Sequence, residues 1–525
     1  MTSGGLPISV PSLRLGELVA TLALAQDNAF GQPFDSQLRS CLLAMALCDE
    51  AGFDEEVRRT TYWVALLRYV GCTGHAHEVS SVFGDDIAIL ARTLVMDAAD
   101  PADVGRTMVE SATAGHPPEE HAEIVQALQA GAHDWAVHNF ATGCEVGDKL
   151  IQRLDLGPDV RKAFGFTYER WNGNGYPTQA KGAQIPLAMR VVHLTHDMEA
   201  ISRRSSPAEA INAARQRRDR TYDPDLADLF VARGSGWFDQ VGAIDPWEAV
   251  LDLEPRPHRM LEGAALDAAL TVAADFIDLK SPYRAGHSRR CAQLAAAAAA
   301  MHGATEQEIT IVRRAALLHE FGTTAIPNSI LDKRSSLTRA ELDRVKLHTV
   351  LTEQMLARSS ALAALNPTAA AHHEKCDGSG YHKGLRADAT DRAGRLLAAV
   401  DIYVGLTTDR SDRPALSADA AATKLRELVS RGELEPAVVD AVLTAAGHQR
   451  AAISAPRNQG PGGLSRRELE VLRLAARGLT TREIADQLFI SPKTADHHVQ
   501  HVYTKINVST RAAAALWAME HDLVH

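Results

Sequence analysis

Several features are scarce in this chain of 525 residues, and each scarcity argues against a class of protein. The six cysteines form no Cys-x-x-Cys pair, which argues against a disulfide scaffold and indicates a reduced, cytoplasmic chain. No apolar run approaches the roughly 18 residues of a membrane span, and the first residues lack a basic segment followed by an apolar core, so we expect neither a span nor a signal peptide. Aromatic residues make up 5% while alanine is abundant, a balance that predicts an all-α protein.

The net charge of -11 argues against a protein that coats nucleic acid along its whole length. A chain of this length should hold several domains, each with its own core. Residues 1–11 are rich in glycine, proline and serine and are expected to be disordered, and residues 449–463 have the composition of a flexible linker. The segments between and after them, 12–250, 256–448 and 464–525, are the predicted domains.

An internal repeat relates the first two predicted domains. The clearest pair of segments reads Glu-Arg-Trp-Asn-Gly-Asn-Gly-Tyr-Pro in the first copy and Glu-Lys-Cys-Asp-Gly-Ser-Gly-Tyr-His in the second. The paired segments are residues 65–71 and 316–322, 169–177 and 374–382, and 190–196 and 395–401. The sequence therefore predicts two copies of one helical domain.

The second copy is rich in side chains that bind metals. Imidazoles and carboxylates together suit iron, manganese, nickel or zinc better than magnesium. The pattern places all seven candidate ligands on helices, which hold ligands firmly: His287, His319, Glu320, His348, His372, His373 and Asp401. A single histidine such as His287 or His348 is more often a cap or a core residue, but the whole set favours a metal site, with room for two ions and a bridging water suited to phosphoryl transfer.

The first copy has different residues at the matching positions. Where the second copy has His319, Glu320, His372, His373 and Asp401, the first copy has Arg68, Tyr69, Thr167, Tyr168 and His196. It keeps the glycine-rich loop, so we expect a non-catalytic copy. In the second copy the loop residues Asp377, Gly378, Gly380 and Tyr381 are the predicted ligand loop, because glycine permits the left-handed backbone of a tight turn.

These motifs resemble those of the HD-GYP domain, a family of metal-dependent phosphohydrolases whose members hydrolyse cyclic di-GMP. The resemblance covers roughly residues 270–410 and extends weakly to residues 15–235. The family signature is similar to His-Asp-x-Gly-Lys, a later His, His-His-Glu-x-x-Asp-Gly-x-Gly-Tyr-Pro-x-Gly-Leu, and a final Asp. The resemblance implies that the metal ligands are His287, His319, His348, His372, His373 and Asp401.

Three departures from that signature bear on chemistry. Glu320 replaces the aspartate of the His-Asp pair, and its oxygen reaches farther by one methylene. Thr323 replaces the lysine that would steady a phosphate, and loss of such a group typically costs about a hundred-fold or more in rate. His382 replaces the proline of the Gly-Tyr-Pro loop. We therefore assign no residue a catalytic role from the sequence.

The last segment predicts a DNA-reading module. Ser465 with Glu468, and Thr480 with Glu483, are capping boxes that each open a helix, and Pro492 suits the first turn of a third helix. Two short helices at a tight turn followed by a polar helix form a helix-turn-helix unit.

Residues 464–523 closely resemble the LuxR-type C-terminal domain, a four-helix module. The resemblance implies that the third helix enters the major groove of double-stranded DNA and that the fourth helix is a dimer face, which predicts a homodimer. Base-reading residues would be Asp496, His497 and Gln500, and phosphate contacts would be Lys493, Thr494 and Lys505. The module carries eight basic and seven acidic residues, so tight binding would need a dimer on two half-sites.

Three functions fit these observations. The first is a DNA-binding transcriptional regulator whose HD-GYP-like domains act as a sensor or a dimerisation platform and bind a metal, a cyclic dinucleotide or another phosphate ligand. The second is a working cyclic dinucleotide phosphodiesterase that the terminal module tethers to DNA. The third is a scaffold in which both copies only pair helices between subunits.

Overall fold

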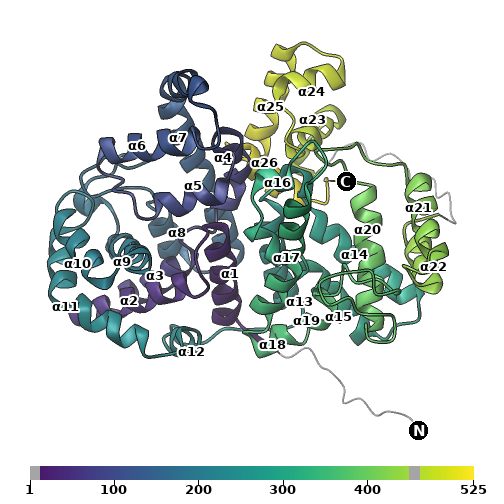
Figure 1. Ribbon diagram of the computed structural model, residues 1–525, viewed down its shortest axis with the longest axis horizontal. Coiled ribbons are helices and arrows are strands. Elements are labelled where there is room, and N and C mark those ends of the chain that lie inside the picture. Colours follow the sequence, from purple (N-terminus) through teal and green to yellow (C-terminus); the bar gives the residue numbers. More distant parts are fainter. Residues whose placement is uncertain (1–11, 449–460, 525) are drawn as a thin grey trace, which may run out of the picture. The chain divides into compact units, whose positions relative to one another are not determined.

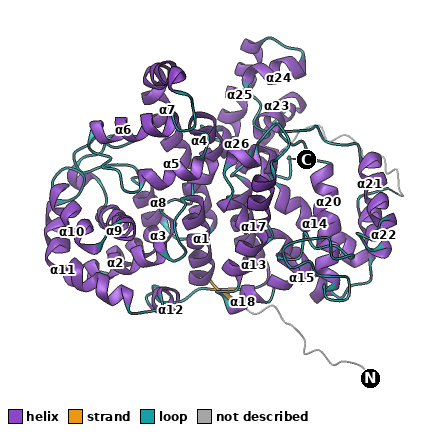
Figure 2. Cartoon of the chain, in the orientation of Figure 1, coloured by secondary structure: helices purple, strands orange, loops and turns teal. Residues whose placement is uncertain are grey.

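The computed structural model describes residues 12–448 and 461–524. Residues 1–11, predicted to be disordered, and most of the predicted linker lie outside the described residues. The described chain is almost entirely helical, with one two-stranded sheet formed by β1 (Leu13–Arg14) and β2 (Met260–Leu261), so the all-α prediction is confirmed (Figure 2). Among the residues described, no helix is long and apolar enough to cross a membrane.

Contacts divide the chain into two compact units, and the main body of the N-terminal unit is residues 14–259. Figure 1 labels its helices, which include a long one, α7. The helices are α1 (Leu15–Ala29), α2 (Ser36–Ala51), α3 (Glu55–Leu67), α4 (Ala76–Phe83), α5 (Asp86–Thr93), α6 (Pro101–Ala112), α7 (His121–Arg153), α8 (Pro158–Phe164), α9 (Leu187–Arg204), α10 (Pro207–Gln216), α11 (Pro224–Gly242) and α12 (Pro246–Asp252). Short 3-10 turns are η1 (Cys72–His75), η2 (Pro118–Glu120) and η3 (Gly182–Gln184).

The main body of the C-terminal unit comprises residues 260–326 and the described residues from 330 onwards. Its first helices are α13 (Gly263–Asp278), α14 (His287–Met301), α15 (Glu306–Leu318), α16 (Asn328–Leu331, of which only Ile330 and Leu331 belong to this body), α17 (Arg339–Leu356), α18 (Ser360–Ala363), α19 (Asn366–Ala369), α20 (Arg392–Leu406), α21 (Ala418–Ser430) and α22 (Pro436–Ala445). The 3-10 turns are η4 (Pro282–Arg284) and η5 (Phe321–Ala325). The segment before the paired histidines forms two short helices, α18 and α19, and the second ends at Ala369.

Corresponding helices pack in the same pairs in both units. In the N-terminal unit α2 packs against α1, α3 and α9, and in the C-terminal unit α14 packs against α13, α15 and α20. The alanine-rich α14 buries Ala292, Ala295 and Ala298, and such small side chains let neighbouring helices approach closely. The packing pattern agrees with a duplicated domain.

Equivalent hydrogen bonds, one in each unit, show which residues correspond at the starts of α2 and α14. Asp27 accepts the backbone N–H of Gln37 at 3.0 Å, and Asp278 accepts the backbone N–H of Ser288 at 2.8 Å. Ser36, the first residue of α2, therefore stands where the second copy has His287, the first residue of α14.

The C-terminal unit ends in a small helical module. It contains η6 (Pro461–Gly463), α23 (Arg466–Ala476), α24 (Thr481–Leu488), α25 (Pro492–Ile506) and α26 (Arg511–Glu520). Both predicted capping boxes are present, with Ser465 accepting from Glu468 N–H and Thr480 accepting from Glu483 N–H. A core that includes Val471, Ile484 and Val499 joins the first three helices, as expected for a helix-turn-helix unit.

Candidate metal and phosphate site

The seven predicted metal ligands come together in the C-terminal unit, but not all from helices. His287 opens α14, while His348 and Asp401 lie within α17 and α20. The prediction that all seven lie on helices is wrong for the other four, which follow the ends of α15 and α19: His319, Glu320, His372 and His373.

Backbone hydrogen bonds explain why the chain leaves the helical path at the paired histidines. The carbonyl of His373 accepts the N–H of Tyr381 at 3.1 Å, and the N–H of Glu374 bonds to Ala371 at 2.9 Å. Because of these bonds the chain continues into the glycine-rich loop and not into another helical turn, so the imidazoles of His372 and His373 lie on a turn.

The ligand atoms form two neighbouring sets. In the first set, Asp401 Oδ1 lies 3.0 Å from His287 Nε2 and 3.7 Å from His319 Nε2. In the second set, the ring nitrogens of His348, His372 and His373 lie within 4.8 Å of one another. Since metal–nitrogen bonds are about 2.1 Å long, ligands sharing one ion lie about 3–4 Å apart. Both sets approach that spacing.

Two carboxylates each face both sets. Glu320 Oε1 lies 3.7 Å from His287 Nε2, and its Oε2 lies 3.8 Å from His348 Nε2. Asp401 places Oδ1 toward His287 and Oδ2 at 3.8 Å from His373 Nδ1. Carboxylates that face two ligand sets in this way are suited to two neighbouring cations that share ligands.

The tautomers of the second set favour a cation between its rings. His348 and His372 each donate Nδ1–H to a backbone carbonyl, of Val345 at 2.6 Å and of Ala369 at 2.7 Å, because a carbonyl oxygen can only accept. Their Nε2 atoms lie 3.0 Å apart. In the neutral rings both of these atoms carry lone pairs, whose repulsion a shared cation would relieve.

Burial keeps these imidazoles in the form that binds metals. It lowers the pKa of His287, His348 and His372 well below the usual value and the pKa of His373 to about 4. Burial opposes ionisation of Asp401 as well, but the hydrogen bond with His287 keeps the pKa of this carboxyl well below its ordinary range. At neutral pH the site therefore offers neutral imidazoles and an ionised carboxylate.

Unpaired buried atoms show that the protein alone does not satisfy the site. His319 donates Nδ1–H to Ala316 O at 2.7 Å, and its Nε2 is buried without a hydrogen-bond partner. Glu320 Oε2 is likewise buried and unpartnered. Because unsatisfied buried polar atoms are costly, the donor set fits a bound divalent cation.

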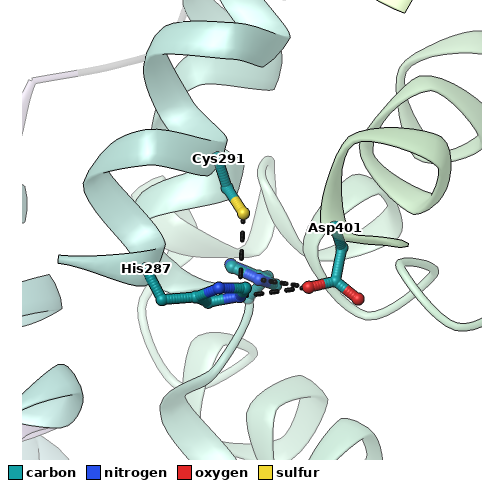
Figure 3. Close-up of side chains that lie close together, drawn as sticks. His287, Cys291 and Asp401 are labelled. Carbon is teal, nitrogen blue, oxygen red and sulfur yellow. Dashed lines mark hydrogen bonds and ion pairs between the residues drawn. The ribbon is translucent and has the colours of Figure 1, made fainter. Parts of the chain in front are cut away.

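A cysteine joins the first set. Cys291 lies one turn after His287 on α14, and its Sγ is 3.6 Å from His287 Nε2 (Figure 3). Figure 3 also shows Asp401 reaching toward His287 from α20. Cys291, His287, His319 and Asp401 form a buried group at ligand spacing. The spacing of four residues along a helix was the sequence signal for Cys291, which the sequence analysis missed.

A cavity of about 180 Å³ opens on the ligands. Its wall includes Glu320, Thr323 and Tyr381, and Tyr381 stacks on His373 with ring centroids 4.7 Å apart. Two arginines that the sequence analysis missed, Arg284 and Arg410, also line it. The cavity is smaller than the roughly 300–1,000 Å³ of most small-molecule sites.

Glu374 holds the glycine-rich loop. Its buried carboxylate accepts the backbone N–H groups of Lys383 and Leu385, both at 2.8 Å. In the first copy Glu169 plays the same part for Thr178 and Ala180, at 2.7 and 2.9 Å. Because the glutamate holds the loop in the same way in both copies, the loop does not need the metal ligands, and the first copy has the loop without them.

We expect Glu374→Ala to loosen this loop. Hydrogen bonds to charged groups contribute about 1.5–3 kcal/mol, so the amides of Lys383 and Leu385 should exchange with deuterium about ten-fold faster or more, as measured by mass spectrometry. Glu169→Ala is the matched control, because it should release only its own loop. Unchanged exchange at Lys383 and Leu385 would contradict this role for Glu374.

Two of the departures from the family signature have clear local partners. His382 contacts Thr349 Oγ1 at 3.0 Å and Glu353 Oε2 at 2.9 Å, so its ring is held by α17. Thr323 lines the cavity, but its hydroxyl donates to Glu320 O at 2.7 Å. The lysine position thus carries no charge.

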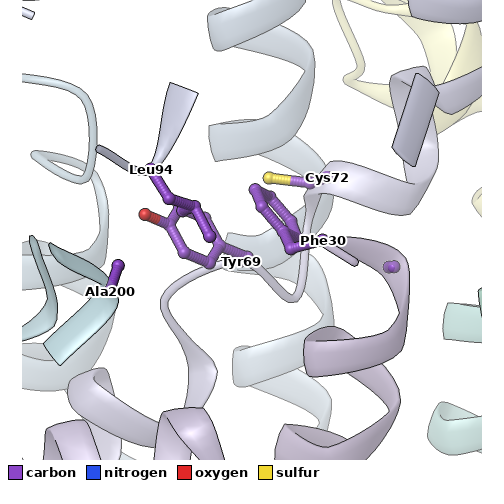
Figure 4. Close-up of a cluster of buried hydrophobic side chains, with 6 residues drawn as sticks. Phe30, Tyr69, Cys72, Leu94 and Ala200 are labelled. Atoms are coloured by element: carbon purple, nitrogen blue, oxygen red, sulfur yellow. The ribbon is translucent and has the colours of Figure 1, made fainter. Parts of the chain in front are cut away.

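In the first copy, aromatic packing takes the place of the ligands. Tyr69, at the position of Glu320, stacks on Phe30 with ring centroids 4.2 Å apart (Figure 4). It also meets the edge of His196, with ring centroids 4.9 Å apart. Arg68, at the position of His319, is buried and pairs with Asp197 at 3.1 Å. In the described part of this unit, no three His, Cys, Asp or Glu residues lie at metal-ligand spacing.

The residues predicted to contact DNA lie on α25, and all six are exposed: Lys493, Thr494, Asp496, His497, Gln500 and Lys505. Lys505 differs from the others because its ammonium group pairs with Glu468 at 2.7 Å. That pairing directs Lys505 toward the capping box of α23.

Comparisons with known proteins agree with this geometry. The HD domain family model matches residues 141–226 and 271–438, and the model of the luxR family of bacterial regulatory proteins matches residues 463–518. A relative from Vibrio cholerae serotype O1, named 3′3′-cGAMP-specific phosphodiesterase 3, is 29% identical over 416 residues, which are 79% of this chain and 90% of that protein. A cyclic di-GMP phosphodiesterase response regulator of Xanthomonas campestris pv. campestris is 36% identical over 162 residues, 29% of this chain and 41% of that protein.

Among solved structures, the crystal structure of a cyclic GMP-AMP specific phosphodiesterase of V. cholerae matches with a TM-score of 0.59 and 25% identity. The match covers 84% of this chain and 99% of that one. HD-domain phosphodiesterases are typically dependent on divalent metals, in keeping with the ligand set described above. The chain is thus a tandem HD-domain protein, related to phosphodiesterases of the HD-GYP type, with a C-terminal domain of the bacterial luxR family.

Proposed function

We propose that this protein is a DNA-binding transcriptional regulator whose second HD domain binds divalent cations and a cyclic dinucleotide. The observation that carries the proposal is the pair of carboxylates, Glu320 and Asp401, each facing both sets of histidines in a chain that also has a luxR-family domain. The compartment that goes with this role is the cytoplasm, where bacterial DNA lies.

In this proposal His287, His319 and Asp401 would hold one cation, and His348, His372 and His373 would hold another. Glu320 and Asp401 would contact both. Iron, manganese, nickel and zinc suit this set of nitrogen and oxygen donors. Bound there, the cations would supply Lewis-acid chemistry at a phosphoryl group. The buried imidazoles and carboxylates would hold the cations, and the cavity would admit a phosphate group beside them.

A homodimer on two half-sites fits the near-neutral charge of the luxR-type module. Phosphate attraction alone gives such a module weak binding, and two linked modules raise the affinity. The polar face of α25 then reads bases, with Asp496, His497 and Gln500 in the groove and Lys493 and Thr494 near phosphates. Lys505 would contact a phosphate on release of its ion pair with Glu468.

Hydrolysis of the bound ligand is the second candidate function. A specific observation favours it: the six histidine and aspartate ligands implied by the resemblance are all present at ligand spacing, and a relative 29% identical over most of the chain is named as a 3′3′-cGAMP phosphodiesterase. Incubation with 3′3′-cGAMP and cyclic di-GMP, followed by chromatography, distinguishes hydrolysis from binding alone, because only hydrolysis yields new products.

The regulator proposal is tested by gel shift against a promoter library with and without these two dinucleotides. We expect specific DNA binding that changes when a dinucleotide is added to metal-loaded protein. DNA binding that responds to neither ligand would contradict the sensory part of the proposal, and lack of any DNA binding would contradict the regulator itself.

A further inference from the structure

The second HD domain has lost the lysine of its signature, yet a cationic side chain reaches its cavity from another element. Arg284 ends η4, three residues before His287 opens α14, and its side chain is only 10% exposed. It lines the same cavity as Thr323, the residue at the lysine position. Arg284 and Thr323 lie in different parts of the chain, so a comparison of the local motif at position 323 does not reveal that an arginine lies in the same cavity.

The guanidinium of Arg284 has more hydrogen-bonding capacity than the protein uses. One nitrogen contacts Glu320, and Nε is buried with no hydrogen-bond partner. A guanidinium group is always protonated at neutral pH, so Arg284 brings a positive charge to the cavity wall. A buried cation with an unsatisfied donor beside a cavity is poised for an anionic ligand.

Arg410 makes the cavity suited to phosphate. It lines the cavity together with Arg284, while the metal-ligand candidates His373 and Asp401 lie in the same wall. Guanidinium groups match the geometry of phosphate oxygens and bind them with two parallel hydrogen bonds.

We propose that Arg284 supplies the phosphate-binding cation that a lysine at position 323 would otherwise supply, with Arg410 as its partner. The inference rests on the proposed function, because the phosphate belongs to the ligand of that site. Without ligand, Arg284 pairs with Glu320. A bound phosphate accepts a hydrogen bond from Nε of Arg284, which Glu320 leaves unpaired.

The competing interpretation is that Arg284 only neutralises Glu320. The two interpretations differ in one variant pair. If Arg284 serves the phosphate, a lysine introduced by Thr323→Lys should restore phosphate affinity to an Arg284→Gln protein. If Arg284 is only a counter-ion of Glu320, Arg284→Gln should alter the metal content, and adding Thr323→Lys should not restore the phosphate affinity.

The experiment uses the full-length protein, with metal content measured on each sample. Inorganic phosphate and 3′3′-cGAMP are titrated by calorimetry into wild type, Arg284→Gln, Arg284→Lys and the Arg284→Gln/Thr323→Lys double variant. Arg290→Gln is the matched control, because Arg290 lies on α14 outside the cavity wall. We expect Arg284→Gln to keep its metal and to bind both probes about 10- to 100-fold more weakly. Arg284→Lys and the double variant should recover most of the loss.

Equal phosphate affinity of wild type and Arg284→Gln would overturn the inference, as would a double variant as weak as Arg284→Gln. A wild-type protein that cannot be loaded with metal would contradict the proposed metal function instead. Phosphate titration of that same sample would still decide the role of Arg284, since the comparison with Arg284→Gln does not depend on the cation.

Discussion

Full-length protein carrying His319→Ala is expected to lose at least one of two divalent cations per chain. The Nε2 of His319 faces Asp401 at 3.7 Å and Glu320 at 3.9 Å, so its removal opens the first ligand set beside both shared carboxylates. Loss of even an outer partner of a metal ligand typically weakens binding by about 10- to 100-fold, and loss of a ligand should cost more. Elemental analysis after loading and desalting measures the content.

His196→Ala is the matched control for this experiment. His196 stands at the position of Asp401 in the first copy, where it meets Tyr69 and not a set of ligands. Its replacement should leave the metal content at the wild-type value. A wild-type chain that retains no metal, or a His196→Ala chain that loses metal, would contradict the assignment of the site to the second HD domain.

The double variant His497→Ala/Gln500→Ala should lose sequence-specific DNA binding. Both side chains are exposed on α25, and a good contact to a base edge gives about 1–3 kcal/mol of discrimination. Together the two changes should weaken binding to the specific site by about 100-fold and leave binding to random DNA nearly unchanged. Fluorescence anisotropy with specific and random duplexes measures both at one salt concentration.

Thr504→Ala is the control on the last turn of the same helix. Its hydroxyl bonds to Gln500 O at 2.9 Å, and its side chain is exposed. It should retain specific binding. An equal loss of specific and random binding in the double variant would show that His497 and Gln500 do not read bases.

Much of the architecture could be predicted from the sequence because local rules determine it. Capping boxes such as Ser465 with Glu468 depend on residues three apart, and they appear where the spacing placed them. The duplication was visible because Glu374 and Glu169 hold equivalent loops through backbone N–H groups, which requires the glutamate and the glycines to be kept.

The division of the ligands into two sets could not be predicted from the sequence. It depends on where the chain leaves the helices α15 and α19. After α19, the carbonyl of His373 accepts a hydrogen bond from the N–H of Tyr381, and this bond between residues eight positions apart could not be predicted from the local sequence. Arg284 was missed for a related reason. It lines the same cavity as Thr323, although the two residues are 39 positions apart in the sequence.

The structure also changes the meaning of Thr323. From the sequence, a threonine in place of lysine suggested a site that had lost its means of handling phosphate. With Arg284 and Arg410 in the cavity wall, the cationic character of the site is retained from other elements. The second copy therefore has the candidate metal ligands and two arginines in one cavity wall, whereas aromatic packing around Tyr69 fills the matching place in the first copy.

The most direct test of two cations in the second HD domain is anomalous diffraction from crystals of the metal-loaded protein, recorded at the absorption edge of the metal. The account predicts two peaks about 3.5–4 Å apart, one beside His287 and His319 and the other beside His348 and His372, with Glu320 and Asp401 near both. A single peak elsewhere, or a peak beside Tyr69 and His196 in the first copy, would contradict it.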